Sequence, residues 1–521
     1  MPRKVLFITA DQWRGDVLGL LGHPAARTPN LDRLAREGTT FTQHYTVATP
    51  CGPARASLLT GLYPFLHRSI RNGAPLDRRH SNIALEVRKA GFDPVLFGYT
   101  DSSADPAEFA PADPRLRSYE GVLPGFRLEA SLNEACLSGW LSELAAKGYN
   151  IPAHLPDIYR HPGTAKVLDR FDRGPAVYKA ADSDTAYIAD KLIQYLRLRR
   201  RQDWFVHAVF LRPHPPAIAP APYNALIEAA SVPAAVKHAS REAERAVHPY
   251  LDAWLRQQES PAYFESQVNV QSLPESDLAA MRAVYFGLIA EVDAQIGRVL
   301  SHLEATGEFD ETLIVFTSDH GEMLGDHWCW GKGGWFDASN HIPLIIRDPR
   351  ASVGARGRRV DAFTESVDLL PTLLDWLGLD VPHEVNGHSL TPWLGGGTPA
   401  AWRDAVFWEF DFRTPHSLAA EQHFGLTPDQ CTLNVIRDAA YKYVHFTALP
   451  PLLYDLKADP HELVNLAGRA DMAPVIARYA QRLLSHRMLH AERSLANAAL
   501  TPAGVVRHTG PRGLLPPMEA P

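Results

Sequence analysis

The chain has 521 residues, 45% of them hydrophobic and 21% charged, so it is long enough for two or three packed units. Its 52 basic and 59 acidic residues give a formal net charge of −7, which excludes the basic footprint of a general nucleic-acid-binding protein. Four cysteines make no disulfide framework, no apolar run approaches the roughly 20 residues that span a bilayer, and the apolar stretch 5–10 is too short for a signal-peptide core. We therefore expect a cytoplasmic enzyme without membrane or nucleic-acid partners.

Apolar strands and helical patterns alternate along much of the chain. Residues 5–9 form a continuous apolar run, which is typical of a strand buried on both faces. Residues 28–38 combine a cap, a proline in the first turn and a glycine stop, which predicts a helix. Similar patterns predict helices over 53–60, 83–90, 185–200 and 275–306, and strands over 94–97, 204–210 and 313–317. This alternation indicates an α/β fold with a mostly parallel sheet sandwiched by helices.

The C-terminal part has a different pattern. Short strands are predicted over 405–410, 432–437 and 441–446, followed by a helix over 473–487. The last stretch, 501–521, carries five prolines and no apolar core. We therefore expect a catalytic domain over 1–390 with insertions around 101–180 and 213–275, a smaller α+β subdomain over 400–490, and an extended arm over 491–521.

Polar residues follow three of the predicted strands. Asp11 and Gln12 follow the first strand, Asp319 and His320 follow the strand over 313–317, and His214 comes soon after the strand over 204–210. Active sites of parallel sheets collect at the carboxyl ends of strands. An oxygen-rich set with one imidazole suits Ca²⁺, Mg²⁺ or Mn²⁺ better than Zn²⁺. Taken alone, these residues could equally cap the following helices.

Cys51 stands just before the helix predicted over 53–60. A lone cysteine there is usually a buried thiol, although a helix N-terminus can also lower a thiol pKa and create a nucleophile. However, Cys51-x-Pro53-x-Arg55 resembles the sulfatase signature. The resemblance extends in the same order through most of the chain, over the blocks Asp11-Gln12, 28–32, the Cys51 segment, 319–322, Gly331-Lys332, 454–456 and Asn465-Leu466.

Within that family the sequence is most similar to the phosphonate monoester hydrolase and arylsulfatase branch. Gln12 stands where many sulfatases have Asp, and His320 where many have Asn. The Gly-Lys-Trp-His block of most sulfatases is replaced by 97–100, Phe-Gly-Tyr-Thr. The resemblance implies an alkaline-phosphatase-like fold and argues against a standard sugar-sulfate enzyme.

The resemblance also implies a mechanism. A formylglycine-generating enzyme would oxidise Cys51 to formylglycine, whose hydrate would attack sulfur or phosphorus and form a covalent intermediate. One divalent metal ion, Mn²⁺ or Ca²⁺, would be held by Asp11, Gln12, Cys51, Asp319 and His320. Arg55 would orient the diol and offset its charge. Lys332 and His214 would bind the transferred group and protonate the leaving oxygen, and Asn72 and Tyr99 would line the substrate side. His214 could instead be structural, and Lys332 a solvated loop lysine.

The leading hypothesis is therefore a hydrolase of singly charged esters, namely aryl sulfates, phosphonate monoesters or phosphodiesters. A second reading keeps the fold but makes the substrate a phosphate monoester. A degenerate, non-catalytic binding protein would predict loss of Asp11, Cys51, Arg55 or Asp319, and all four are present. A redox-thiol protein would need a second cysteine near Cys51, and none occurs. The C-terminal arm further suggests a homo-oligomer, a dimer or a tetramer.

Overall fold

A computed structural model of the chain describes residues 3–134, 136–160, 170–199, 201–259, 268–414, 417–492, 495–507 and 513–515. Its main sheet has eight strands that are parallel to their neighbours, except that β7 runs antiparallel to β6 and β2. In spatial order the strands are β4 (Arg127–Ser131), β3 (Val95–Gly98), β5 (Trp204–Phe210), β1 (Lys4–Ala10), β6 (Thr312–Ser318), β7 (Leu344–Arg347), β2 (Thr39–Tyr45) and β8 (Arg358–Glu365). The predicted mostly parallel sheet is confirmed.

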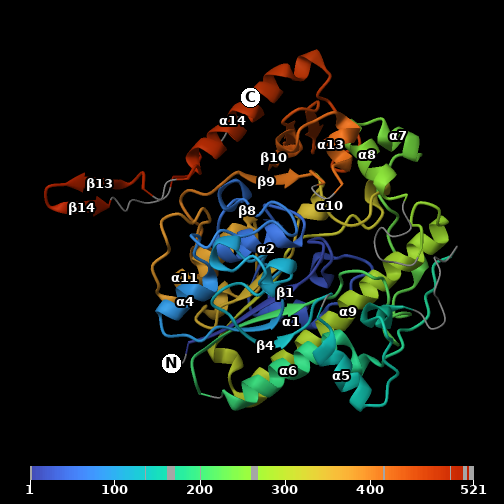
Figure 1. Cartoon of the computed structure of the whole chain (residues 1–521), viewed down its shortest axis with the longest axis vertical. Coiled ribbons are helices and arrows are strands. Elements are labelled where there is room, and N and C mark those ends of the chain that lie inside the picture. The colour runs from blue at the N-terminus through green and yellow to red at the C-terminus, as the bar shows by residue number, and fades with distance from the viewer. Residues whose placement is uncertain are drawn as a thin grey trace.

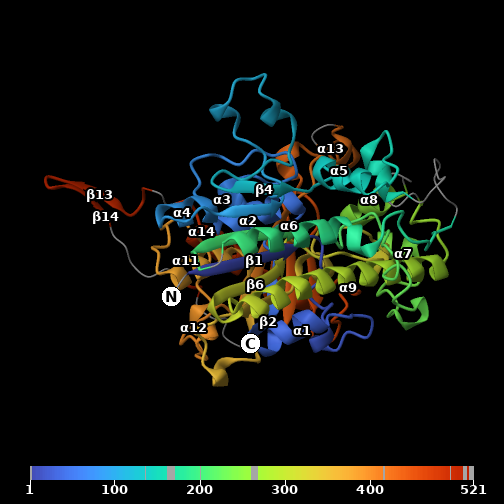
Figure 2. The same cartoon turned by 90° about the horizontal axis from the view of Figure 1, so that it is seen from below.

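Helices cover both faces of this sheet (Figures 1 and 2). Because strand side chains alternate between faces, Leu6 and Ile8 of β1 enter one core, and Val5 and Phe7 enter the other. The first core includes α1 (Pro29–Arg36), α5 (Ser138–Ala146), α6 (Asp184–Leu198) and α9 (Glu275–Thr306). The second includes α2 (Cys51–Thr60), α4 (Ile83–Lys89), α11 (Leu369–Leu377) and α12 (Thr391–Leu394).

A second, antiparallel sheet forms the C-terminal part, as predicted. Its strand order is β12 (Leu452–Asp455), β11 (Tyr441–Phe446), β10 (Thr432–Asp438) and β9 (Ala405–Asp411). The helix α14 (Ala473–Leu489) packs Tyr479 and Leu483 against one face, and the other face shares a core with α8 (Pro249–Gln257). Beyond α14, a hairpin of β13 (Ala498–Thr501) and β14 (Gly504–Arg507) projects away from the molecule (Figures 1 and 2).

The region expected to be an insertion around 101–180 contributes β4, which pairs with β3 at the edge of the main sheet. Further short helices relevant to the site are α3 (Pro64–His67), α7 (Arg241–Arg245), α10 (Asp337–Asn340) and α13 (Ala419–Phe424). The division of the chain near residue 390 stays a prediction, and residues 493–494, 508–512 and 516–521 of the predicted arm lie outside the described residues.

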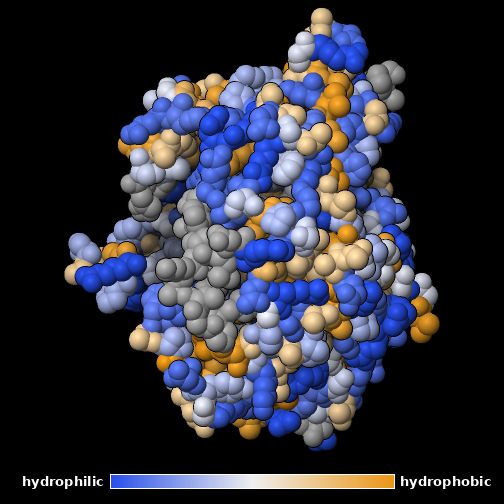
Figure 3. Space-filling view, turned by 90° about the vertical axis from the view of Figure 1, so that its right-hand side faces the viewer, coloured by the Kyte–Doolittle hydropathy of each residue, from blue (hydrophilic) through white to orange (hydrophobic). Residues whose placement is uncertain are grey.

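On the face shown in Figure 3, the hydrophobic residues stand in small groups between hydrophilic ones. No helix in the described parts of the chain has both the length and the apolar character needed to cross a membrane.

Candidate active site

The candidate site lies where four neighbouring parallel strands end. The strands β3, β5, β1 and β6 are adjacent in the sheet, so their carboxyl ends meet at one edge. The side chains that follow them are Tyr99 after β3, His214 after β5, Asp11 after β1, and Asp319 with His320 after β6. The helix α2 begins at this edge with Cys51. The fold therefore brings together the strand-end residues that the sequence singled out.

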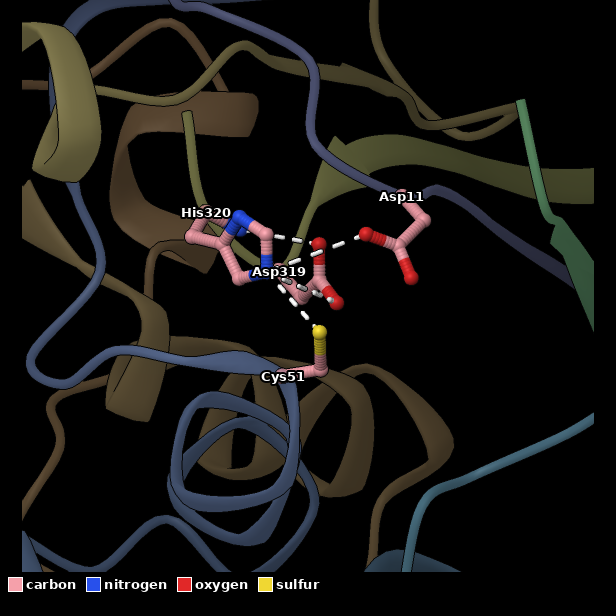
Figure 4. A group of neighbouring side chains, drawn as sticks. All are labelled: Asp11, Cys51, Asp319 and His320. Carbon is pink, nitrogen blue, oxygen red and sulfur yellow. Dashed lines mark hydrogen bonds and ion pairs between the residues drawn. The ribbon is translucent and has the colours of Figure 1, made fainter. Parts of the chain in front are cut away.

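Four buried side chains converge at this edge (Figure 4). They are Asp11, Cys51, Asp319 and His320, and one ligand atom from each lies within 4.8 Å of all the others. The Cys51 Sγ atom is 3.2 Å from His320 Nε2. Within the described part of the chain, this is the one group of His, Cys, Asp and Glu side chains with a geometry that could hold a metal ion.

The donor set fits a divalent cation. Asp11 Oδ1 is buried and has no hydrogen-bond partner among the described residues. His320 Nδ1 donates to the Gly321 carbonyl oxygen at 3.0 Å, so the lone pair of Nε2 faces the cluster. Two carboxylates and one imidazole of the predicted set meet here beside position 51, and such ligands suit a divalent cation. We therefore identify this cluster as a possible metal site. The Gln12 amide oxygen accepts a hydrogen bond from Lys332, so the role of Gln12 as a ligand stays a prediction.

Arg55 holds the two carboxylates of this cluster in place. Its Nη2 donates to Asp11 Oδ2 at 2.8 Å and its Nε to Asp319 Oδ2 at 2.9 Å. Its Nη1 donates to the Tyr99 carbonyl oxygen at 3.1 Å, and the guanidinium carbon lies 4.0 Å from the centre of the Tyr99 ring. The hydrogen bonds of Arg55 therefore go to the carboxylates, and its predicted role in orienting a diol stays a prediction.

Tyr99 and Asn72 were both predicted to line the substrate side. The buried Tyr99 donates its hydroxyl hydrogen to Asp11 Oδ2, so it supports a candidate metal ligand, and its contact with a substrate stays a prediction. Asn72 Oδ1 accepts a hydrogen bond from the Gly52 backbone N–H at 2.8 Å. A Cβ atom at position 52 would lie 3.1 Å from Asn72 Oδ1, which favours glycine after Cys51.

Lys332 connects Gln12 to His214. Its Nζ donates to Gln12 Oε1 at 2.6 Å and to His214 Nε2 at 3.0 Å. His214 Nδ1 donates to the Pro215 carbonyl oxygen at 2.9 Å. Burial and the neighbouring Lys332 hold the pKa of His214 well below its usual range, so this histidine is neutral. Gln12, a predicted metal ligand, directs its amide oxygen to Lys332.

The ionisation of Cys51 and Lys332 follows from their surroundings. Burial, reinforced by the charge of Asp11, raises the pKa of the Cys51 thiol well above its usual value. An unmodified thiol here is therefore protonated at neutral pH, which disfavours the thiolate nucleophile considered above. Burial opposes the charge on Lys332, but the neighbouring carboxylates of Asp11 and Asp319 help to raise its pKa above the usual value.

Sequence reasoning missed three carboxylates. Glu322 accepts hydrogen bonds from the Gln12 side chain and from the backbone of Leu324 and Gly331, and burial raises its pKa to about 7. Burial also raises the pKa of Asp101 to about 7, and its Oδ2 lies 3.7 Å from Arg55 Nε. The third, Glu134, has its Oε1 3.2 Å from His214 Nδ1. Glu322 is the last residue of the block 319–322 that carries the family resemblance, so that resemblance could have pointed to it.

Comparisons with known proteins agree with this geometry. The family model described as sulfatase matches residues 3–379, and the model described as N-sulphoglucosamine sulphohydrolase, C-terminal, matches residues 325–488. The chain is 42% identical over 512 residues to the multifunctional alkaline phosphatase superfamily protein PehA of Trinickia caryophylli, covering 97% of this chain and 99% of that protein. It is 28% identical over 476 residues to an arylsulfatase of Clostridium perfringens, covering 89% and 90% of the two chains.

A solved structure adds to these matches. The phosphonate monoester hydrolase of Agrobacterium radiobacter is 47% identical, with a TM-score of 0.92, and the match covers 98% of this chain and 100% of that one. The near-complete coverage includes the C-terminal sheet as well as the strand ends that carry the site. The chain therefore belongs to the sulfatase family of ester hydrolases, within the alkaline phosphatase-like superfamily.

Proposed function

We propose that this enzyme hydrolyses singly charged esters, namely aryl sulfates, phosphonate monoesters and phosphodiesters, using one divalent cation and a formylglycine derived from Cys51. The observation that carries the proposal is the convergence of position 51 with Asp11, Asp319 and His320 within 4.8 Å. The names of the relatives, which include a phosphonate monoester hydrolase and an arylsulfatase, support the substrate range. Conversion of Cys51 requires a formylglycine-generating enzyme in the host.

The residues around position 51 prepare it to act as a nucleophile. Asp11, Asp319 and His320, with Gln12 beside them, would hold Mn²⁺ or Ca²⁺. When bound, such a cation lowers the pKa of a coordinated hydroxyl and stabilises negative charge on the transferred group. The N-terminus of α2 adds a favourable potential for an anion. Arg55 and Tyr99 fix the orientation of Asp11.

Lys332 is suited to contact the transferred group and the leaving oxygen. Its ammonium group has three N–H donors, of which one points to Gln12 and one to His214. The third donor is available to a substrate oxygen, where it would offset charge and supply the proton to the leaving alcohol. His214 is neutral and accepts from Lys332, so we assign it the role of holding the ammonium group in position.

A phosphate monoesterase of the same fold is the second candidate. Such an enzyme would bind two metal ions, and the described residues contain one candidate metal cluster. The doubly charged phosphate would also face a single lysine, Lys332. Both features favour singly charged esters.

The decisive experiment compares kcat/KM for the metal-loaded enzyme on one matched set of aryl esters: a sulfate, a phenylphosphonate, a phosphodiester and a phosphate monoester. With a constant leaving group, the ratios report the preference for the transferred group. We expect the singly charged esters to lead. A lead for sulfate would make the enzyme an arylsulfatase, and a lead for phosphonate or diester a phosphonate monoester hydrolase. A lead for the phosphate monoester, or no turnover, would contradict the proposal.

A further inference from the structure

A cleft of about 720 Å³ opens beside the catalytic edge. Pro50, Asn72 and Lys332 are among its lining residues, and each of them belongs to the site or adjoins it. Its volume is in the range of small-molecule binding pockets. Lys332 lines this cleft and is the candidate proton donor to the leaving oxygen, so the departing alcohol would lie in the cleft.

Aromatic rings form the wall of the cleft. Tyr250 and Trp254 of α8 have ring centroids 6.0 Å apart, and Phe412, which follows β9, lies 5.1 Å from Tyr250. Two glycines bring the Lys332 loop against this wall, because a Cβ atom at Gly334 would be 3.5 Å from the Trp254 and Tyr250 rings, and one at Gly333 would be 3.1 Å from Phe410. Rings in this arrangement favour a flat, aromatic ligand.

Within the described part of the chain, the guanidinium of Arg71 in this cleft has buried N–H donors without an acceptor. The Nε and Nη1 atoms of Arg71 are buried and have no hydrogen-bond partner among the described residues. By contrast, the guanidinium of Arg256 bonds to Asp252 at 2.9 Å, and that of Arg413 bonds to Asp411 at 2.8 Å. An arginine is always charged, and burying its donors without an acceptor is costly. The guanidinium of Arg71 lines the cleft and lacks an acceptor for these two donors among the described residues, so it suits an anionic oxygen group of a ligand.

We propose that this cleft binds the alcohol half of the ester, and that the preferred alcohol is aromatic and carries an anionic group of its own, such as a carboxylate, which pairs with Arg71. The single charge required by the proposed function is that of the transferred group, which faces Lys332 and not Arg71. The inference rests on the proposed function, because it assigns the leaving alcohol of that reaction. It adds the chemical class of the alcohol, which the reaction centre itself does not select.

The test uses two phenylphosphonate esters, one of 4-hydroxyphenylacetate and one of 4-hydroxyphenylacetamide. The methylene group separates the substituent from the phenolic oxygen, so the two leaving groups differ mainly in charge. With Mn²⁺-loaded full-length enzyme, we expect kcat/KM to be about tenfold higher, or more, for the carboxylate ester, which is the size of a charge-assisted hydrogen bond. Arg71→Gln should bring this ratio to about one, and Arg71→Lys should retain part of it.

Arg256→Gln is the matched control, because Arg256 lines the same cleft but is paired with Asp252. We expect this variant to keep the carboxylate preference. A wild-type ratio of one or less, or a ratio that Arg71→Gln leaves unchanged, would overturn the proposal. Circular dichroism and the melting temperature show whether each variant is folded.

Calorimetric titration with the two free alcohols separates this inference from the proposed function. We expect 4-hydroxyphenylacetate to bind more tightly than the amide, and this difference to disappear in Arg71→Gln. If neither ester is hydrolysed but the binding difference appears, the cleft assignment stands and the proposed reaction is wrong. If both esters are hydrolysed equally and the alcohols bind equally, the reaction stands and the cleft assignment is wrong.

Discussion

Asp11 receives two donors on one oxygen and none on the other. The Arg55 guanidinium and the Tyr99 hydroxyl both donate to Oδ2, whereas Oδ1 has no partner among the described residues. The carboxylate is therefore held in one orientation with a free oxygen directed at the candidate metal cluster. Such supporting contacts usually change metal affinity or activity by about 10–100-fold.

Removing the Tyr99 hydroxyl tests this arrangement. We expect Tyr99→Phe to lower kcat/KM by roughly tenfold or more and to raise the Mn²⁺ concentration needed for half-maximal activity, because Asp11 loses one of its two donors. A metal titration of activity measures both. Tyr63→Phe is the matched control, since the Tyr63 hydroxyl donates to Glu365 at 2.5 Å within another buried pair. An unchanged Mn²⁺ requirement in Tyr99→Phe would show that the Tyr99 hydroxyl does not support metal binding through Asp11.

The conversion of Cys51 to formylglycine, and its need for turnover, can be tested directly. We expect the tryptic peptide 37–55 of active enzyme to have the mass of an aldehyde in place of CH₂SH, and we expect Cys51→Ala to abolish turnover. Mass spectrometry measures the mass of the peptide, and steady-state kinetics measure the turnover of the variant. Cys431→Ala, at a buried thiol in the C-terminal sheet region, should stay active. Full activity with an unmodified thiol, or in Cys51→Ala, would refute the mechanism.

At the level of elements, the central strands were predictable and the outer ones were not. β1, β5 and β6 are buried along their whole length, so each is a continuous apolar run that the sequence makes visible. β2 contains threonines, a glutamine and a histidine, β8 contains arginines and acidic residues, and β4 is a partly exposed edge strand, so none of them has that pattern. The antiparallel direction of β7 depends on its neighbours and not on its own residues.

The same reasoning explains what could be predicted of the site. Asp11 and Asp319 directly follow recognisable strands, so the sheet geometry alone brings them together. Asp101, Glu134 and Glu322 stand in loops, and their burial comes from tertiary packing that no local pattern reports. The partners of Tyr99 and Gln12 were unpredictable for the same reason, because they depend on side-chain directions at strand ends.

The long helix α9 carries a buried carboxyl that should make stability depend on pH. Burial, with the nearby charge of Asp184, raises the pKa of Glu291 from 4.5 to about 8. Between these values the folded protein binds more protons than the unfolded chain, so the free energy of unfolding falls as pH rises. We expect Glu291→Gln to have a melting temperature that exceeds the wild-type value by a margin that grows from pH 5 to pH 9.

Thermal unfolding at several pH values measures that margin. Glu304→Gln is the control on the same helix, because Glu304 is exposed and pairs with Arg33 at the surface. The control should follow the wild type at every pH. A margin for Glu291→Gln that stays constant or shrinks as pH rises would show that this carboxyl does not titrate as assigned.

At the scale of the whole molecule, metal binding should contribute to stability. A cation that binds only the folded chain stabilises it by about 2.7 kcal/mol at a concentration one hundred times its Kd. We expect chelation to lower the melting temperature of the wild type, and added Mn²⁺ or Ca²⁺ to restore it. Asp319→Asn should respond much less. Equal melting temperatures with and without chelator would contradict the assignment of the cluster.

The C-terminal hairpin suggests how copies of the chain associate. β13 and β14 project from the molecule, and Leu500 and Val505 are 88% and 59% exposed. A two-stranded hairpin is marginally stable by itself, so we expect it to pack on another copy in a dimer or tetramer. Sedimentation velocity of the full chain and of a chain ending at residue 490 measures this. We expect the shorter chain to dissociate, and a full chain that is only monomeric would contradict the prediction.

The reacting atoms come from strand ends and the first turn of α2, whereas the walls of the adjoining cleft come from α8, the end of β9 and α13. Mutations can therefore change the walls of the cleft without changing the residues of the reaction centre. Substitutions in 249–257 or 419–424 can exchange one alcohol for another while the bond-breaking apparatus is passed on unaltered. Related enzymes can therefore evolve different substrate ranges while they keep the same catalytic residues. Randomised libraries confined to those two segments would be a direct way to change the substrate range in the laboratory.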